Sequence, residues 1–162
     1  MRITAAAALG AATLLSQGCP SAYQRTYEKE TQRLEAEQRA AEARAAAEHA
    51  QASRYAAVVY FDVGSTVIGD DGQRELRWFV QRIQPYPQAV ILVQGFADST
   101  GAEAKNRTLS EDRARAVAGF LGAQGISSSR IVTQGYGTES PAAANATVQG
   151  RSRNRRVEVT VQ

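Results

Sequence analysis

An almost continuous apolar run at residues 89–96 (AVILVQGF) is followed by a short polar loop and then by a segment whose apolar residues recur at helical spacing. A run this short and apolar indicates a strand that helices cover on at least one face and that lies inside its sheet. Gly125 suits the left-handed residue that ends many helices. The inward face of the helix before it is formed by Leu109, Ala114, Val117, Ala118 and Leu121. A strand joined to a helix in this way predicts a layered α/β domain.

A similar strand and helix precede this unit. Residues 56–62 (AAVVYFD) are β-branched and aromatic, which predicts the first strand. Asp70 or Asp71 is expected to cap the helix that follows, and Pro85 and Pro87 to end it. The apolar face of that helix is expected to consist of Leu76, Phe79, Val80 and Ile83.

Two further strands complete the pattern. Residues 131–136 predict a third strand, and Val157, Val159 and Val161 alternate with polar residues in a fourth. The loop of residues 137–154 between them has room for one short helical turn. The order βαβαβ followed by a last β predicts a sandwich with helices on one face, and we expect residues 55–162 to form this single globular domain.

The first nineteen residues have the composition of an export signal. Arg2 provides a positive start, an apolar stretch too short to span a bilayer follows, and the segment ends at Cys19. Cys19 is the only cysteine, so no disulfide within the chain is possible. Its place after Gly18 resembles a bacterial lipoprotein processing site, which would make Cys19 the point of lipid attachment. The alternative is an incidental thiol after an ordinary cleaved signal.

Residues 20–54 are rich in Ala, Glu, Arg and Gln, with few large aliphatic side chains. Glu35 with Arg39 and Arg44 with Glu48 stand at helical spacing, and each pair stabilises a helix by a few tenths of a kcal/mol. We expect a helical tether here, because a heptad seam made mostly of alanine buries too little area for a coiled coil. Weak oligomerisation through the alanine face is the alternative.

The polar loop after residue 96 and the helix that follows it contain an acid and a base that could bind one ligand together. Asp98 follows the end of the apolar strand, and Arg113 is expected near the start of the next helix. Open α/β sheets bind ligands at such strand ends, and arginine grips a carboxylate with two parallel hydrogen bonds. Two opposite charges fit a small zwitterion, with Thr100 and Asn106 offering short polar groups. The simpler alternatives are an Asx turn closed by Asp98 and a surface ion pair of Arg113.

Residues from about 57 to 162 resemble the OmpA-like C-terminal domain of peptidoglycan-associated lipoproteins, porin-like outer-membrane proteins and flagellar stator components. The motifs that carry the resemblance are YFDVGST, GFADSTG at 95–101, NRTLSEDRARAV at 106–117 and NRRVEV at 154–159. Any one of these motifs is weak alone, whereas their joint spacing is specific. The resemblance implies a βαβαββ sandwich whose four-stranded mixed sheet carries its helices on one face.

The resemblance also implies a binding site. Domains of this family bind the peptide stem of the cell wall at meso-diaminopimelate without cleaving it. The family's binding acid and arginine fall on Asp98 and Arg113. Positions that line the same pocket match Thr100, Asn106 and Leu109. Asn154 and Arg155 match a segment that supports the pocket, and Asp62 is a candidate for a similar supporting role.

Other function classes find little support. The only histidine, His49, lies in the tether and the only cysteine at the end of the signal, so a metal site or a Cys/His pair is not expected. No HExxH, GxSxG or P-loop motif is present, and we expect neither an enzyme nor a cofactor. The basic cluster at residues 151–156 could contact phosphates, but an exported chain rarely meets nucleic acid.

These inferences predict a lipid-anchored clamp that links the outer membrane to peptidoglycan from the periplasmic side. Its partners would be peptidoglycan, membrane lipid through acylated Cys19, and possible envelope proteins. Two alternatives stay open. One is an adaptor whose helical segment recruits a partner protein, and the other is a cell-wall hydrolase.

Overall fold

The structure of the protein, a computed structural model, describes residues 21–162. The predicted signal segment and Cys19 lie outside this range. The chain divides into two compact units between Ala41 and Glu42. None of the described helices is long and apolar enough to cross a bilayer.

Helix α1 (Ala22–Ala52) begins with a reciprocal cap. The Ser21 hydroxyl accepts a hydrogen bond from the Gln24 main chain at 3.2 Å, and the Gln24 side chain accepts one from the Ser21 main chain at 2.9 Å. This capping box satisfies two amide donors that the first turn of a helix leaves free.

The side chains of α1 are almost all exposed. The predicted pair of Arg39 and Glu35 is present at 3.8 Å, whereas no ion pair joins Arg44 and Glu48 among the described residues. Only the last residue of the helix, Ala52, is buried, and it belongs to the core of the second unit.

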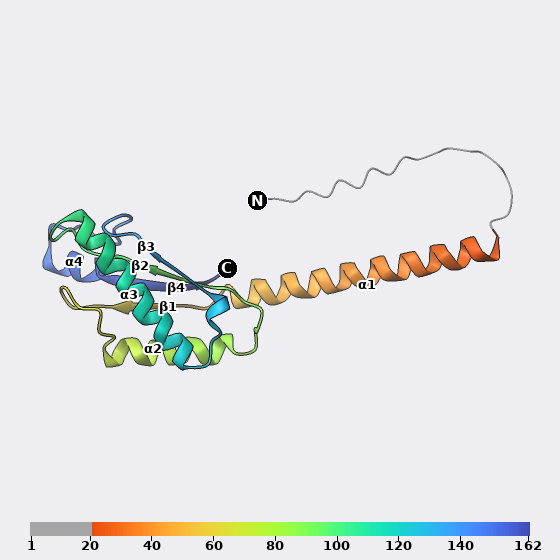
Figure 1. Ribbon diagram of the computed structural model, residues 1–162, viewed down its shortest axis with the longest axis horizontal. Helices are drawn as coiled ribbons and strands as arrows, with labels where there is room; N and C mark the ends of the chain where they lie inside the picture. Colours follow the sequence, from red (N-terminus) through yellow and green to blue (C-terminus); the bar gives the residue numbers. More distant parts are fainter. Residues whose placement is uncertain (1–20) are drawn as a thin grey trace. The chain divides into compact units, whose positions relative to one another are not determined.

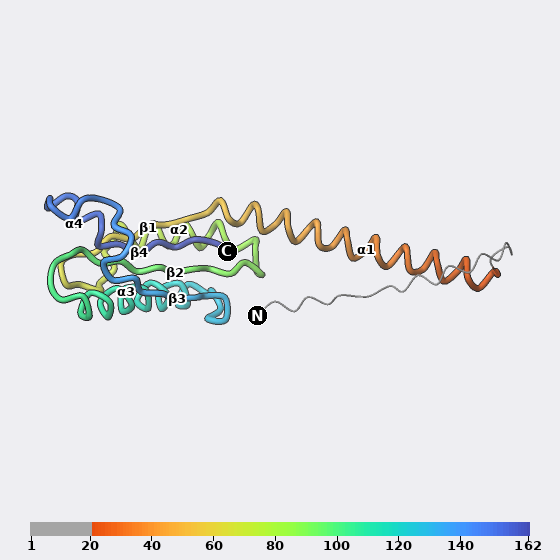
Figure 2. The backbone as a smooth tube through the Cα atoms, turned by 90° about the horizontal axis from the view of Figure 1, so that it is seen from above, coloured from red at the N-terminus to blue at the C-terminus, as the bar shows by residue number. Residues whose placement is uncertain are grey.

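Four strands form one mixed sheet in the order β1-β4-β2-β3. Strand β4 pairs antiparallel with both β1 and β2, and β2 pairs parallel with β3. Figure 2 shows the strands side by side in this order. Their bounds are β1 Ala56–Tyr60, β2 Ile91–Gly95, β3 Ile131–Gly135 and β4 Arg156–Val161. The run at 89–96 therefore contains an interior strand, as predicted.

Helices α2 (Asp70–Ile83) and α3 (Glu103–Ala123) cover one face of this sheet (Figure 1). The short helices η1 (Ser128–Arg130) and α4 (Val148–Asn154) lie in the connections to β3 and β4. Alternate strand residues meet the helices and close the core, which includes Val59, Val93, Val157, Val159, Leu76, Phe79, Ile83, Val117 and Leu121. Helices α2 and α3 leave the other face of the sheet uncovered, which explains why β1 alternates buried and exposed side chains.

Two details of the helices differ from the prediction. The residue that caps α2 is Gly69, without a side-chain hydrogen bond, and Asp70 and Asp71 lie inside the first turn. Their carboxylates act there through the helix dipole instead of through capping. Arg113 lies in the middle of α3 and not near its start. The predicted left-handed residue after α3 is confirmed, with φ +95° at Gly125.

Glycine brings α3 close to the sheet beside the predicted site. A Cβ atom on Gly95, the last residue of β2, would lie 1.9 Å from the main-chain oxygen of Ser110. A Cβ on Gly135 at the end of β3 would lie 2.4 Å from a side-chain carbon of Glu111. Only glycine permits this approach, so these two residues bring α3 against the carboxyl ends of both strands.

Candidate functional site

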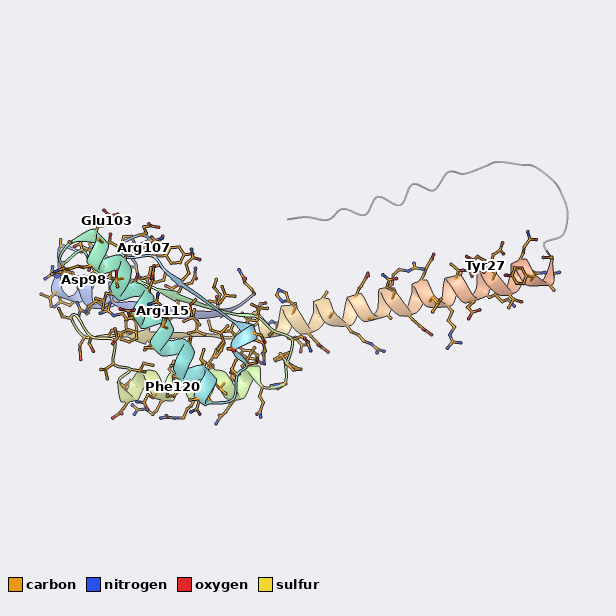
Figure 3. All side chains as sticks on the ribbon, in the orientation of Figure 1. Tyr27, Asp98, Glu103, Arg107, Arg115 and Phe120 are labelled. Atoms are coloured by element: carbon orange, nitrogen blue, oxygen red, sulfur yellow. The ribbon has the colours of Figure 1, made fainter. Side chains whose placement is uncertain are left out.

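A pocket of about 250 Å³ lies at one end of the sheet. Strands β1 and β2 both run antiparallel to β4, so their carboxyl ends meet the amino end of β4 there. Figure 3 shows Asp98 at this end, near the first turns of α3 that carry Glu103 and Arg107. The pocket is lined by Val63, Gly64, Ala97, Asp98, Thr100, Gly101, Lys105, Asn106, Leu109, Arg113 and Arg155.

Asp98 is held from three sides and is only 6% exposed. The main-chain N–H of Thr100 donates to its Oδ1 at 2.8 Å, so the Asx turn that was the simpler alternative for Asp98 is present. Arg155 donates to its Oδ2 at 2.8 Å, and the Asn106 amide donates to its main-chain oxygen at 3.1 Å. Burial by itself would raise the pKa of the Asp98 carboxyl. Hydrogen bonds from Arg155 and Thr100 outweigh burial and hold that pKa below its usual range.

Arg155 is the ionic partner of Asp98. It lies between α4 and β4, and its side chain is 13% exposed. Its Nε donates to the main-chain oxygen of Phe61 at 3.0 Å, which fixes the guanidinium across the pocket wall. The sequence predicted only a supporting role for Arg155, whereas in the structure Arg155 forms an ion pair with Asp98. The two residues are 57 positions apart in the chain, so no local pattern could reveal the pair.

Arg113 lines the same pocket and is completely buried. Its Nε donates to the oxygen of Ser65 at 2.8 Å, and its terminal nitrogens donate to the oxygens of Phe96 at 3.2 Å and Asp62 at 2.9 Å. Arg113 thus joins the loop after β1 to the end of β2. Burial and then the charge of Arg155 lower the pKa of Arg113 to about 10, against an opposing effect of Asp98. The guanidinium remains protonated at neutral pH.

Asn154 supports the pocket from behind without lining it. It is fully buried and exchanges hydrogen bonds with the main chain of Ala143 at 2.8 and 2.9 Å. Its amide also donates to Oδ1 of Asn145, and that oxygen accepts the main-chain N–H of Ser99 at 3.1 Å. This chain of contacts ties the loop before α4 to the turn that carries Asp98.

The other predicted residues differ in their places. Thr100, Asn106 and Leu109 line the pocket together with Asp98. The side chain of Asp62 does not line it, and this residue supports the site only through the oxygen that accepts from Arg113. Sequence reasoning missed Lys105 and the β1–α2 loop residues Val63 and Gly64. Val63 and Gly64 lie inside the motif YFDVGST, and Lys105 directly precedes the motif that begins at Asn106, so their positions could have indicated them.

The pocket therefore offers a fixed anion beside an excess of positive charge. Asp98 is the one acid in its lining, against Arg113, Arg155 and Lys105. These side chains suit a ligand that carries at least one carboxylate and also one positively charged group. No group of three or more potential metal-binding His, Cys, Asp or Glu side chains occurs within residues 21–162.

A protein-family model described as the OmpA family matches residues 60–155, a range that contains every element of this pocket. The chain belongs to the OmpA family. This membership agrees with the mixed sheet and the helices on one of its faces, which were predicted from the motifs.

Two curated proteins resemble about two thirds of the chain. The probable lipoprotein YiaD of Escherichia coli (strain K12) is 41% identical over 103 residues, which cover 64% of this chain and 47% of YiaD. The peptidoglycan-binding protein ArfA of Mycobacterium tuberculosis (strain ATCC 25618 / H37Rv) is 37% identical over 105 residues, covering 60% of this chain and 32% of ArfA. The chain thus spans less than half the length of these two relatives.

A solved structure confirms the fold of this OmpA-family domain. The crystal structure of the peptidoglycan-associated lipoprotein from Burkholderia pseudomallei matches with a TM-score of 0.63 and 31% sequence identity. The match covers 65% of this chain and 90% of that one.

Proposed function

We propose that this chain binds peptidoglycan non-covalently, through the meso-diaminopimelate of the stem peptide, in the pocket that contains Asp98. The observation that carries the proposal is the buried pair of Asp98 and Arg155 beside the buried Arg113, in a cavity of about 250 Å³. The free end of diaminopimelate is an amino-acid head, with one ammonium and one carboxylate on the same carbon. Asp98 supplies the anion and the arginines supply the cations that such a head requires.

The arginines keep donors for a ligand. A guanidinium has five N–H groups. Arg113 uses three of them on main-chain oxygens, and Arg155 donates one to Phe61 and one to Asp98. The remaining N–H groups can donate hydrogen bonds to the ligand carboxylate. The free lone pairs of Asp98 can accept hydrogen bonds from the ligand ammonium. Each charge-assisted hydrogen bond contributes about 1.5 to 3 kcal/mol, so a single head group binds at about micromolar to millimolar strength.

The names of two similar proteins support peptidoglycan as the ligand. ArfA is called a peptidoglycan-binding protein, and the Burkholderia protein a peptidoglycan-associated lipoprotein. Both carry a domain similar to the one that holds the pocket here. We extend this binding role to the present chain as part of the proposal.

The segment before the domain suits an anchored module. We propose that Cys19 is acylated, that the protein resides at the outer membrane facing the periplasm, and that α1 spaces the domain from the lipid. The 31 residues of α1 span roughly 45 Å at 1.5 Å per residue. Because anchoring confines a weak binder near a lattice of repeated stems, individually weak contacts become a lasting and reversible clamp.

Sedimentation with insoluble peptidoglycan tests the binding. The full chain should pellet with the wall material, and free meso-diaminopimelate should compete. Lysine blocked at its α-amino and α-carboxyl groups, which keeps only the side-chain ammonium, should not compete. Asp98→Ala should abolish pelleting. Glu103→Gln is the matched control, since Glu103 is an exposed acid on the first turn of α3 outside the pocket lining. Pelleting of Asp98→Ala equal to that of the parent would refute the site.

Two further measurements address the chemistry and the anchor. Incubation of the pure protein with peptidoglycan should release no soluble fragments. A release that disappears in Asp98→Asn would replace the binding role with hydrolysis. Labelling with a radioactive fatty acid in an exporting bacterium should mark the parent chain but not Cys19→Ala, and a labelled Cys19→Ala would contradict the anchor.

A further inference from the structure

Strand β1 is an edge strand with a free side. The main-chain N–H of Phe61 donates to Arg155 at 2.9 Å, just beyond the register that pairs Tyr60 with Arg156. Bonding alternates along an antiparallel pair, so Val59 also bonds to β4 while the N–H and C=O groups of Val58 and Tyr60 point to the other side. No further strand of the described chain pairs there. These groups form a short template for an added strand.

A groove runs along this free side. Its volume is about 640 Å³, larger than the diaminopimelate pocket proposed above. It lies between the edge of β1 and the amino-terminal half of α2, where Gly72 and the capping residue Gly69 present no side chain to it. The full lining is Val58, Tyr60, Asp62, Val67, Gly69, Asp70, Asp71, Gly72 and Glu75. It shares no lining residue with the pocket of Asp98.

Apolar side chains stand exposed along this groove. Tyr60 is 57% exposed, Val67 is 74% exposed and Val58 is 37% exposed. Single exposed apolar residues need no explanation, but three that line one groove beside a free strand edge form a surface that a partner can cover.

The charge of the groove selects its occupant. Asp62, Asp70, Asp71 and Glu75 are all exposed, and the lining contains no basic residue. Asp71 contacts Arg74, which leaves three of the four carboxylates without an ion pair among the described residues. The opposite edge of the sheet differs. The pocket beside β3 holds Arg107 and Arg115 as well as Glu111, so basic residues outnumber acidic ones there.

Helix chemistry explains only part of this charge. Asp70 and Asp71 lie in the first turn of α2, where acids stabilise a helix through its dipole. Asp62 precedes the helix by a full loop, and Glu75 lies beyond its first turn, so neither acid has that role. Both nevertheless face the same groove.

We propose that this groove binds a basic, extended polypeptide segment of a partner protein, which pairs with β1 as an additional strand. The outward groups of Val58 and Tyr60 would form the main-chain bonds. Alternate apolar side chains of the segment would cover Tyr60 and Val67, and its lysines or arginines would meet the four carboxylates. A second copy of this chain is a poor occupant, because pairing two β1 edges would bring the two acidic groups together.

Nuclear magnetic resonance of the full chain labelled with ¹⁵N tests this proposal without peptidoglycan, so its outcome is independent of the pocket function. The probes are a ten-residue peptide of alternating lysine and valine and its glutamate–valine counterpart. The lysine peptide should shift the amide signals of Val58 and Tyr60 and slow their hydrogen exchange. It should bind at least about tenfold more tightly than the glutamate peptide, since several surface charge pairs of a few tenths of a kcal/mol each add up to that ratio.

Two variants separate strand pairing from general attraction. Tyr60→Pro removes an outward N–H, which an edge strand tolerates, and should abolish the slowed exchange at Val58. Asp62→Asn with Glu75→Gln should weaken binding of the lysine peptide about threefold. Glu28→Gln with Glu30→Gln, which makes the same charge change on α1, should leave its binding unchanged.

Three results would overturn the proposal. The first is equal binding of the two peptides. The second is binding of the lysine peptide that Asp62→Asn with Glu75→Gln does not weaken. The third is a concentration-dependent dimer of the parent chain whose contacts include Val58 and Tyr60, which would assign the edge to a second copy.

Discussion

Arg155 and Asp98 form a nearly buried ion pair of 2.8 Å, although 57 positions separate them in the chain. The pair joins the amino end of β4 to the turn after β2. Arg155 also donates to the oxygen of Phe61 at the end of β1, so a single guanidinium holds three strand ends together. The proposed ligand would therefore bind to groups that the fold itself has already fixed in place.

Asp98→Asn should weaken peptidoglycan binding at least tenfold and also lower the free energy of unfolding. The amide keeps the shape of the carboxylate but leaves the charge of Arg155 without its partner, a loss of about 1.5 to 3 kcal/mol. Urea unfolding followed by circular dichroism measures the stability. A variant as stable as the parent would show that Arg155 gains nothing from Asp98.

The pH dependence of the same variant pair reports the titration of Asp98. The folded-state pKa of Asp98 lies below its unfolded value of about 3.9. Its contribution to stability is therefore complete above that unfolded value and is lost as pH falls through the folded one. The difference in unfolding free energy between parent and Asp98→Asn should stay constant from about pH 7 to pH 5 and shrink below about pH 4. A difference that changes between pH 5 and 7 would contradict the assignment.

Arg113→Lys should destabilise the protein even though it retains the positive charge. An ammonium on a flexible stem cannot reach the oxygens of Ser65, Phe96 and Asp62 together, and each unpaired buried oxygen costs about 1 to 3 kcal/mol. Chemical unfolding measures the loss. Arg115→Lys, on an exposed arginine of the same helix, serves as the control and should change stability by less than about 0.5 kcal/mol.

Asn154→Ala should loosen the loop before α4 and, through it, the turn that carries Asp98. The substitution removes both hydrogen bonds to Ala143 and the one to Asn145. Hydrogen exchange at the amides of Ala143 and Ser99 should speed up, and peptidoglycan binding should weaken. Unchanged exchange at Ser99 would mean that the contact through Asn145 does not transmit the effect.

Gly95→Ala should separate α3 from β2. The new Cβ would lie 1.9 Å from the oxygen of Ser110, so the helix or the strand must move. We expect a loss of about 1 to 3 kcal/mol, as for other overpacked sites, together with weaker binding. Gly119→Ala is the control, because a Cβ there meets nothing within 4 Å. That substitution should leave thermal stability unchanged or slightly raised.

Local sequence patterns were sufficient for the elements of the fold. β-Branched and aromatic composition located β1, apolar alternation located β4, the continuous run located β2, and helical spacing with Gly125 located α3 and its end. These signals are reliable because they arise within a few residues of one another. The prediction that Asp70 or Asp71 caps α2 was wrong. An acid interacts favourably with the helix dipole from inside the first turn as well, so the sequence did not distinguish the two positions.

Through its resemblance to the OmpA-like domain, the sequence also indicated that Asp98, Thr100, Asn106, Leu109 and Arg113 gather at one site. It could not decide what each side chain contacts. That Arg155 pairs with Asp98, while Arg113 donates to three main-chain oxygens, depends on the meeting of strand ends far apart in the chain. Side-chain propensities act over a few residues, whereas ion pairs and buried hydrogen bonds are chosen by tertiary packing, and here only that packing decided the partner of each charge.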